Sequence, residues 1–326
     1  MDEALSMDEA LSMSLTTARR GGAPLPPVHV LVVAYGDPGA LSDCLEELHG
    51  AYPVVVVDNS SSATTHDVVA RAGAHYIDPG ENLGFAAAVN RGIAAVPVPE
   101  ADVLLLNPDA LIGVGDVERL RRELHASAAI GCVAPAQHRP GSDRASPVCW
   151  PFPTPGRAWA EAVGLGRFAT GWGYVIASVL LVRGEALVDV GGFDEGFFLY
   201  AEEADWERRA TRRGWAMHYC PEARAVHVGA GTDPDPTRRE ARFHAGVETY
   251  VRKWFGALGW HSYRAATVLT ALRRAVVFRG ERRKASWHLA RLYAAGPGST
   301  ARRRGVIPER PHHVPVVVGP DTEEVE

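Results

Sequence analysis

Short apolar runs alternate with polar, helix-forming segments along the first half of the chain. The runs VHVLVVA (28–34) and PVVVVD (53–58) are apolar at nearly every position, which is typical of strands buried on both faces of a sheet. Alternating strands and helices predict right-handed crossovers and a mainly parallel central sheet covered by helices on both faces, an α/β class. We expect further strands at 75–77 and 130–136, and a strand that runs into a polar turn at 103–110. Helices are expected at about 37–49, 64–72, 85–96 and 116–126.

The second half of the chain is less regular. Residues 137–170 are rich in Pro and Gly with interspersed aromatic side chains, which indicates a lid or an acceptor surface; the alternative is a floppy insertion. Strands are expected at 173–183, 215–220 and 225–228, with a short helix ending at Val190. Past Pro236 the pattern is helical.

The C-terminal helical pattern carries most of the positive charge. Between Arg264 and Arg304 there are ten Arg and one Lys against one acid, Glu281, a balance of 11 − 1 = +10 in a chain whose net charge is −5. Leu, Val, Trp and Tyr at helical spacing lie between these cations. The hypothesis is an amphipathic helix on an anionic membrane surface, and the alternative is a helix packed on the domain with solvated arginines.

The composition is that of a soluble globular protein, with 326 residues and 46% hydrophobic side chains. No apolar run approaches the roughly 20 residues of a membrane span, and no signal peptide is evident, so we expect a cytoplasmic protein. The four cysteines, Cys44, Cys132, Cys149 and Cys220, are far apart without a CxxC pair, which predicts reduced, mostly buried thiols. The tandem MDEALS repeat opens an expected disordered leader, residues 1–27, in which Met7 or Met13 is an alternative start; 306–326 is an expected disordered tail.

Candidate chemistry lies where the predicted strands end and in the stretch 191–209, GGFDEGFFLYAEEADWERR. There Glu202 and Glu203 follow an aromatic run, and a carboxylate at the edge of a core can acquire the raised pKa of a general base. The alternative is a helix N-terminus at which acids favour the dipole. Asp109 at a strand end is a candidate ligand for a hard divalent cation, and His227 could join it if the cation is Mn²⁺.

Several function classes are disfavoured by missing motifs. The chain has no GxGxxG and no GxxxxGK[ST], which argues against a dinucleotide-binding Rossmann enzyme and a P-loop NTPase. It also lacks GxSxG, so a hydrolase of that type is not expected.

Five blocks in order resemble the family 2 glycosyltransferases of the GT-A fold, and most closely their bacterial rhamnosyltransferase-like branch. The blocks are VVVVDNSS (54–61), GENLGFAAAVNRGI (80–93), LLLNPDA (104–110), VGGFDEGFFLYAEEADWERRATRRGW (190–215) and AVHVGAGT (225–232). The resemblance covers roughly residues 28–256. It implies a nucleotide-sugar-binding half at 28–136, an acceptor and catalytic half at 137–256, and a basic helical extension at 257–305.

The resemblance also implies an inverting hexosyltransferase that uses a nucleoside diphosphate sugar and a divalent metal, Mn²⁺ or Mg²⁺. Glu203, where Asp is usual, is the favoured base; Glu202 is the alternative, and Asp205 is assigned to holding backbone or an acceptor hydroxyl. Asp109 and His227 would bind the metal. The residues implied in nucleotide-sugar binding are Tyr35, Asp58, Asn82, Asn90, Asn107 and Asp109.

The leading hypothesis is transfer of L-rhamnose from dTDP-L-rhamnose to a glycan or a polyprenyl-diphosphate-linked precursor of a cell-envelope polysaccharide. The enzyme would be cytoplasmic, with peripheral attachment at the inner face of the cell membrane as the added hypothesis of the basic helices. Alternatives are a UDP-hexose donor, a soluble natural-product acceptor, a sugar nucleotidyltransferase and an inactive nucleotide-binding remnant. Nucleic acid is not an expected partner.

Overall fold

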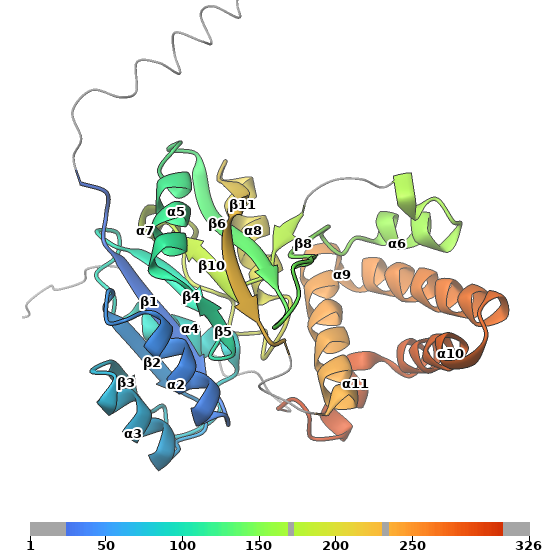
Figure 1. Cartoon of the computed structure of the whole chain (residues 1–326). Coiled ribbons are helices and arrows are strands. Elements are labelled where there is room, and N and C mark those ends of the chain that lie inside the picture. The colour runs from blue at the N-terminus through green and yellow to red at the C-terminus, as the bar shows by residue number, and fades with distance from the viewer. Residues whose placement is uncertain (1–23, 169–172, 230–234, 309–326) are drawn as a thin grey trace, which may run out of the picture.

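A computed structural model describes residues 24–168, 173–229 and 235–308. Figure 1 shows a central sheet with helices on both faces at one side and a group of C-terminal helices at the other. Within these ranges no helix combines the length and the apolar character that crossing a bilayer requires.

The first three predicted strands match at their boundaries within one residue, and the later ones differ. The strands of the structure are β1 (Val28–Ala34), β2 (Val54–Asp58), β3 (His75–Ile77), β4 (Asp102–Leu106), β5 (Ala110–Ile112), β6 (Ile130–His138), β7 (Ala145–Ser146), β8 (Cys149–Trp150), β9 (Tyr174–Val175), β10 (Val179–Val182) and β11 (Ala216–His227).

The helices begin at residues suited to capping. Asp37, Ser62 and Thr154 each accept backbone N–H groups of the first turn that follows, and proline stands in the first turn of α2, α6 and α9. The helices are α2 (Pro38–Glu47), α3 (Ala63–Arg71), α4 (Phe85–Ile93), α5 (Val114–Leu124), α6 (Pro155–Ala162), α7 (Gly184–Val190), α8 (Glu202–Arg212), α9 (Pro236–Val277), α10 (Gly280–Ala295) and α11 (Pro297–Arg303), with a 3₁₀ turn η1 at Gly166–Phe168.

The main sheet has the order β3-β2-β1-β4-β10-β6-β11-β5, with β7 paired to β6. Strands β3, β2, β1, β4, β6 and β11 point one way, whereas β10, β5 and β7 point the other. The predicted mainly parallel sheet is thus mixed in its second half. The carboxyl ends of β1, β2 and β4 lie at one edge, where ligands of such sheets bind.

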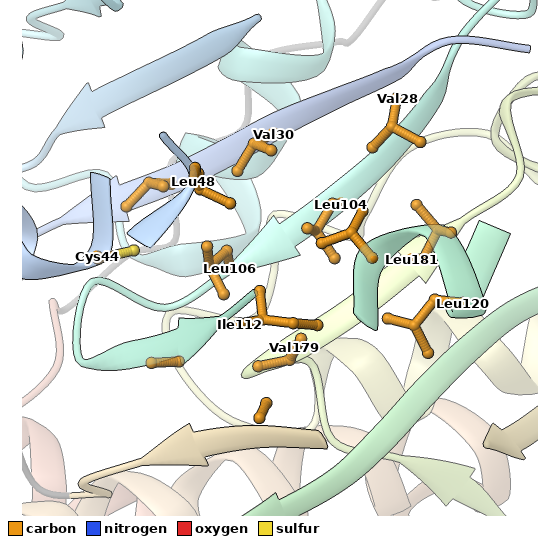
Figure 2. Packing of buried hydrophobic residues seen from close by; sticks show 14 of the residues in the cluster. Val28, Val30, Cys44, Leu48, Leu104, Leu106, Ile112, Leu120, Val179 and Leu181 are labelled. Carbon is orange, nitrogen blue, oxygen red and sulfur yellow. The ribbon is translucent and has the colours of Figure 1, made fainter. Parts of the chain in front are cut away.

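Alternation of side chains divides the core into two layers. Val28, Val30 and Val32 of β1 pack with α2, α3 and α5 on one face, and Leu31 and Val33 pack with α4, α7 and α8 on the other. Figure 2 shows the first layer, in which side chains of β1, β4 and β10 meet those of α2 and α5. Every strand of the sheet centre is therefore buried on both sides, as its continuous apolar sequence requires.

A third apolar cluster joins the sheet to the C-terminal helices. Phe197 and Ala204 pack against Tyr250 of α9, and beyond a kink in α9 the same cluster continues to Trp260 and to Tyr293 of α10. The kink is at Gly256, whose φ of 67° is outside the helical region. The second half of α9, α10 and α6 pack on one another beside the sheet.

The strand expected over 103–110 does run into a polar turn. Strand β4 ends at Leu106, and 107–110 forms a turn closed by the Ala110 N–H on the Asn107 carbonyl, since Pro108 has no N–H for a ladder; β5 then follows. Other sequence expectations are corrected. Strand 173–183 is split, into β9 and β10, whereas 215–220 and 225–228 form the single bulged β11. The segment 137–170 is not a loop throughout, since it contains β7, β8 and α6.

The leader and tail expectations fall mostly on residues outside the described ranges. At their described edges the chain is packed and not disordered. Arg121 donates to the carbonyls of Leu25 and Pro26, and Val306 is buried beside Ala241.

Leu104 tests the packed layer of Figure 2. It is fully buried between β1, β10 and α5, so Leu104→Ala should lower the free energy of unfolding by about 2–5 kcal/mol through lost apolar burial and a residual cavity. Chemical denaturation measures this loss. The exposed Leu258 is the matched control, and Leu258→Ala should change stability by less than about 0.5 kcal/mol. Equal effects would contradict the assigned core.

Candidate active site

The turn that precedes α8 is strained and held from two sides. Tyr200 and Ala201 have φ of 70° and 72°, left-handed values that cost non-glycine residues energy. The backbone of Tyr200 lies so close to α9 that a Cβ on Gly246 would be 2.2 Å from its carbonyl oxygen. Phe198 in turn accepts the N–H of Phe85 at the start of α4, at 2.8 Å. The turn fixes the direction in which Glu202 and Glu203 leave the backbone.

The Glu202 and Glu203 carboxylates are poorly hydrated and adjacent. Each has an Oε2 atom that is shielded from solvent and has no hydrogen-bond partner among the described residues. Burial raises the pKa of Glu203 to about 7, although backbone N–H groups at the helix start oppose the shift. Burial and then the charge on Glu203 raise the pKa of Glu202 well above its ordinary range. The charge on Glu203 thus opposes ionisation of Glu202, so the pair favours a state in which one of the two carboxylates is protonated.

The carboxylate of Asp205, the third acid of the stretch, forms ion pairs with a lysine and an arginine. Its Oδ1 lies 2.7 Å from Lys253 Nζ and accepts from Trp254 Nε1 at 2.9 Å, while its Oδ2 accepts from Arg209 Nε at 3.0 Å. Lys253 also contacts Asp194 Oδ2 at 2.5 Å. The Asp205 side chain is fully buried in this network and ties α8 to α9 and to the loop before it.

The β4–β5 turn and the end of β11 bring together the predicted metal residues. His227 Nε2 lies 3.3 Å from Asp109 Oδ1 and 3.5 Å from Asn107 Nδ2. The backbone holds this arrangement, because Gly229 N–H donates to Asp109 Oδ2 and Val228 N–H to the Asp109 carbonyl. Burial and the Asp109 charge raise the pKa of Cys44 to about 12, so this neighbour stays a neutral thiol.

Asp58 is buried at the end of β2, and its carboxylate organises the loop that follows. It accepts from the Ser60 N–H at 2.9 Å and hydroxyl at 2.5 Å, from the Ser62 N–H at 2.8 Å, and from the Tyr76 hydroxyl at 3.0 Å. Tyr35, one residue past β1, is by contrast partly exposed. The structure thus places Tyr35 on the surface at the sheet edge and Asp58 beneath it within the protein.

The two asparagines of the 80–93 block act on the backbone. Asn82 Oδ1 accepts the Gly84 N–H at 2.9 Å, which closes the turn into α4. Asn90 is buried and makes a paired contact with the backbone of Phe193, donating to its carbonyl and accepting from its N–H, both at 2.8 Å. Asn90 also donates to Glu195 Oε1 at 2.9 Å. These contacts join α4 to the loop before α8.

One cavity of about 570 Å³ unites the carboxylate pair with the Asn107–His227 end. Its polar end is formed by Asn107, Ser178, Glu202, Glu203 and His227. Its other walls come mainly from α6, α9 and α10 and are largely aromatic and apolar. They also carry two arginines and the acid Glu161, which lies 3.7 Å from Arg157. The residues of this far end include Trp150, Pro153, Arg157, Tyr263, Arg274, Leu289 and Tyr293. Asp205, Asp58, Asn82 and Asn90 are not among the lining residues.

Several lining and supporting residues escaped the sequence analysis. His244 lines the cavity, shares a hydrogen bond of 3.0 Å with the Tyr293 hydroxyl, and has its pKa lowered to about 4 by burial. In the sequence Tyr293 is marked only by the helical spacing of a basic segment, and Tyr263 is not marked at all. The sequence does set Lys253 apart, because it is one of only two lysines in a chain that otherwise uses arginine as its cation. No local sequence pattern indicates that these side chains reach the cavity, because they are brought there by the kink in α9 and by the packing of α10 on it.

Within the described residues, no group of three or more His, Cys, Asp and Glu side chains is arranged to hold a metal ion. The Asp109 and His227 pair nevertheless presents a carboxylate oxygen and an imidazole nitrogen to each other at 3.3 Å, both largely shielded from solvent. Such a donor set suits Mn²⁺ when further oxygens come from a ligand.

Sequence comparison finds related sugar transferases. A model described as glycosyl transferase family 2 matches residues 29–162. An N-acetylglucosaminyl-diphospho-decaprenol L-rhamnosyltransferase of Mycobacterium tuberculosis is 29% identical over 241 residues, covering 64% of this chain and 78% of that protein. The rhamnosyltransferase WbbL of Escherichia coli is 27% identical over 220 residues, covering 61% and 83%.

Solved structures share the fold. A mannosyltransferase from Pyrobaculum calidifontis, in complex with GDP-Man and Mn²⁺, has a TM-score of 0.54 at 15% identity over 92% of this chain and 86% of its own. A glucosyl-3-phosphoglycerate synthase from Mycobacterium tuberculosis, in complex with phosphoglyceric acid, has a TM-score of 0.51 at 15% identity over 70% and 80%. The predicted GT-A fold, with its C-terminal helical extension, is confirmed.

Removal of the Asp205 carboxylate should be strongly destabilising. Asp205→Ala leaves Lys253 and Arg209 without their shared buried partner, so we expect a loss of about 3–5 kcal/mol in the free energy of unfolding, measured by urea denaturation. The exposed ion pair of Glu281 and Lys284 is the control, and Glu281→Ala should cost less than about 1 kcal/mol. A loss of under about 1 kcal/mol for Asp205→Ala would contradict the buried network.

Proposed function

Because the chain belongs to the glycosyl transferase family 2 and is a glycosyltransferase, we propose that it transfers L-rhamnose from dTDP-L-rhamnose with inversion. The acceptor is a glycan or a polyprenyl-diphosphate-linked precursor of a cell-envelope polysaccharide. The rhamnosyltransferase relatives support the donor sugar. The observation that carries the proposal is the position of Glu203, at the polar end of a cavity that also holds Asn107 and His227.

Glu203 is the proposed general base. Its carboxylate takes the proton of the acceptor hydroxyl while that oxygen forms a bond to C1 of the sugar. The bond from C1 to the diphosphate oxygen breaks on the opposite side, and the leaving nucleoside diphosphate keeps the electron pair. Glu202, whose protonated form is favoured by burial and by the charge on Glu203, is proposed to donate a hydrogen bond to the acceptor. Asp205 is proposed to position both of them by fixing the start of α8.

Asp109 and His227 are the proposed holders of a divalent metal. Their 3.3 Å separation and the oxygen and nitrogen donor types fit Mn²⁺, with Mg²⁺ as the alternative, once diphosphate oxygens complete the set. When bound, the metal supplies positive charge against the charge that develops on the leaving diphosphate. The Mn²⁺ complex of the mannosyltransferase from Pyrobaculum calidifontis supports this assignment.

The nucleotide is proposed to bind at the edge formed by β1, β2 and β4. Tyr35 is exposed there and is proposed to pack on the base, and Asn107 faces the sugar diphosphate. Asp58 accepts four hydrogen bonds and is proposed to shape the base pocket by holding the loop 59–62. A ring N–H of the base would then donate to a carboxylate oxygen that already accepts a backbone N–H of this loop. Asn82 and Asn90 are proposed to hold α4 as the wall of the same pocket.

The acceptor is proposed to fill the far end of the cavity. Aromatic and apolar walls suit a sugar ring and a hydrocarbon chain, and Arg157 and Arg274 suit an acceptor diphosphate. The proposed roles follow the order of the chain. The nucleotide sugar binds to 28–136, the catalytic carboxylates belong to 137–256, and the acceptor end is completed by 257–305. The kink at Gly256 supports the last boundary. The basic charge of 257–305 supports the peripheral attachment to a membrane that the sequence suggested.

The alternatives remain distinct in their consequences. A UDP-hexose donor keeps the reaction and changes only the nucleotide and the sugar. A soluble acceptor keeps the donor side. A sugar nucleotidyltransferase or an inactive binding remnant would bind nucleotide without transferring a sugar.

Glu203→Gln should lower kcat by about 10²–10⁴-fold, because glutamine cannot accept the proton. Glu202→Gln is the matched control and should have a much smaller effect, since burial and the charge on Glu203 favour the protonated form of Glu202. In the wild type the ionised fraction of Glu203 rises with pH through about 7, so the rate should fall as the pH is lowered below that value. Steady-state rates across pH measure both effects. The reverse order of the two variants would make Glu202 the base.

Nucleotide binding tests the donor assignment directly. Thermal-shift titrations with dTDP, UDP and GDP, each with and without Mn²⁺, should show the largest Mn²⁺-dependent stabilisation with dTDP. Asp109→Asn should abolish the metal dependence because it removes the charged ligand. A preference for UDP would move the donor to UDP-hexoses, and the absence of any nucleotide response would overturn the proposal.

A further inference from the structure

The second half of α9 turns an apolar stripe outward. Leu258, Leu269, Leu272 and Val276 are all exposed, with 86% of Leu258 and 84% of Val276 accessible to solvent. Their spacings of eleven, three and four residues put them on one side of a helix of 3.6 residues per turn. The opposite side of the same helix, with Trp260, Thr270 and Ala271, is buried. The stripe is therefore additional to the side that packs against the protein.

The stripe ends in an apolar tip between α9 and α10. Val277 is 69% accessible and Phe278 is also exposed, and α10 adds the exposed Trp287. Six cations lie within 273–284 against one acid, a balance of 6 − 1 = +5. Arg282 lies over the Phe278 ring, 5.9 Å from its centroid. The cations are Arg273, Arg274, Arg279, Arg282, Arg283 and Lys284.

This combination does not fit a helix whose outer face is merely solvated. A solvated face is polar, whereas here large apolar side chains face outward beside arginines. Apolar side chains flanked by Lys and Arg match the boundary of a bilayer, where hydrocarbon lies beneath anionic headgroups. A second copy of this chain would bring an equal positive charge to the surface, which opposes pairing through it. Charge complementarity therefore favours an anionic lipid surface.

We propose that the hairpin surface, defined as Leu258, Leu269, Leu272 and Val276–Phe278 with the cations of 273–284, docks on an anionic bilayer. The chain lies on the membrane at this surface and does not span it. The valines and Phe278 enter the headgroup boundary, and Arg279, Arg282 and Arg283 contact lipid phosphates while their stems lie along apolar surface.

The docked hairpin also shapes the far end of the cavity. Thr270 and Arg274 of α9 and Leu289 of α10 line that end, so the membrane contact presents it to the lipid surface. This second step rests on the proposed function, since it makes the bilayer the source of the acceptor. The docking itself does not depend on sugar transfer.

Vesicle sedimentation of the full chain tests the docking. Wild-type protein should sediment with vesicles of phosphatidylglycerol and phosphatidylcholine at low salt, less at high salt, and little with phosphatidylcholine alone. The double variant Val276→Asp/Val277→Asp should bind at least about tenfold more weakly because it puts charge in the apolar contact. Arg279→Gln/Arg283→Gln should bind on the order of 25-fold more weakly, about fivefold for each cation lost.

Two control variants carry the same kinds of change elsewhere. Val188→Asp alters an exposed valine of α7, and Arg71→Gln alters an exposed arginine of α3; both should bind vesicles as the wild type does. All variants should keep the thermal-shift response to dTDP and Mn²⁺, which separates loss of docking from failure of the proposed function.

Three results would overturn the docking surface. The first is wild-type protein that stays in the supernatant with anionic vesicles at low salt. The second is a hairpin variant that binds as tightly as the wild type. The third is a stable dimer in light scattering that Val276→Asp/Val277→Asp dissociates, since the surface would then be a contact between two copies.

Discussion

The buried carboxylate of Asp205 is the interaction on which the architecture of the site depends. It meets Lys253 and Trp254 of α9 and Arg209 of its own helix, and Arg209 in turn donates to the carbonyls of Val190 and Gly192. A charge removed from water needs partners on every side, and here those partners come from the helix of Asp205 itself and from α9. The first half of α9 is thereby joined to the helix that carries Glu203. The position of Glu203 in space is set by residues some fifty positions later in the chain.

Close backbone contact is the second constraint. Two consecutive left-handed residues precede α8, and they are tolerated because Gly246 and Gly84 leave room for the Tyr200 and Phe198 carbonyls. The turn delivers two neighbouring carboxylates into the cavity, and their buried Oε2 atoms have no hydrogen-bond partner among the described residues. Burial raises the pKa of both carboxyl groups, and the charge on Glu203 adds to the shift of Glu202. Packing energy from the rest of the fold thus maintains an arrangement that the turn alone would not adopt.

Much of the first half of the fold could be predicted from sequence, because a strand that is buried on both faces of the sheet is apolar at nearly every position. The directions of β10 and β5 could not, since a strand's orientation depends on its partners and not on its own residues. At the site, Asp109 and His227 do lie together, as their shared place at strand ends indicated. Asn90 was expected in the pocket from a motif alone, yet its amide is used on the Phe193 backbone. The aromatic end of the cavity was invisible because it arises only when kinked helices fold back onto the sheet.

Gly256 divides α9 at the point where the catalytic side gives way to the hairpin. Nothing lies within 4 Å of where its Cβ would be, so no side-chain contact enforces the bend there. The relative orientation of the two halves of α9 is instead held by side-chain packing in the apolar cluster around Trp260 and Tyr293. A change in the hairpin can therefore reshape the far end of the cavity while the carboxylate pair and the Asp109–His227 turn keep their places.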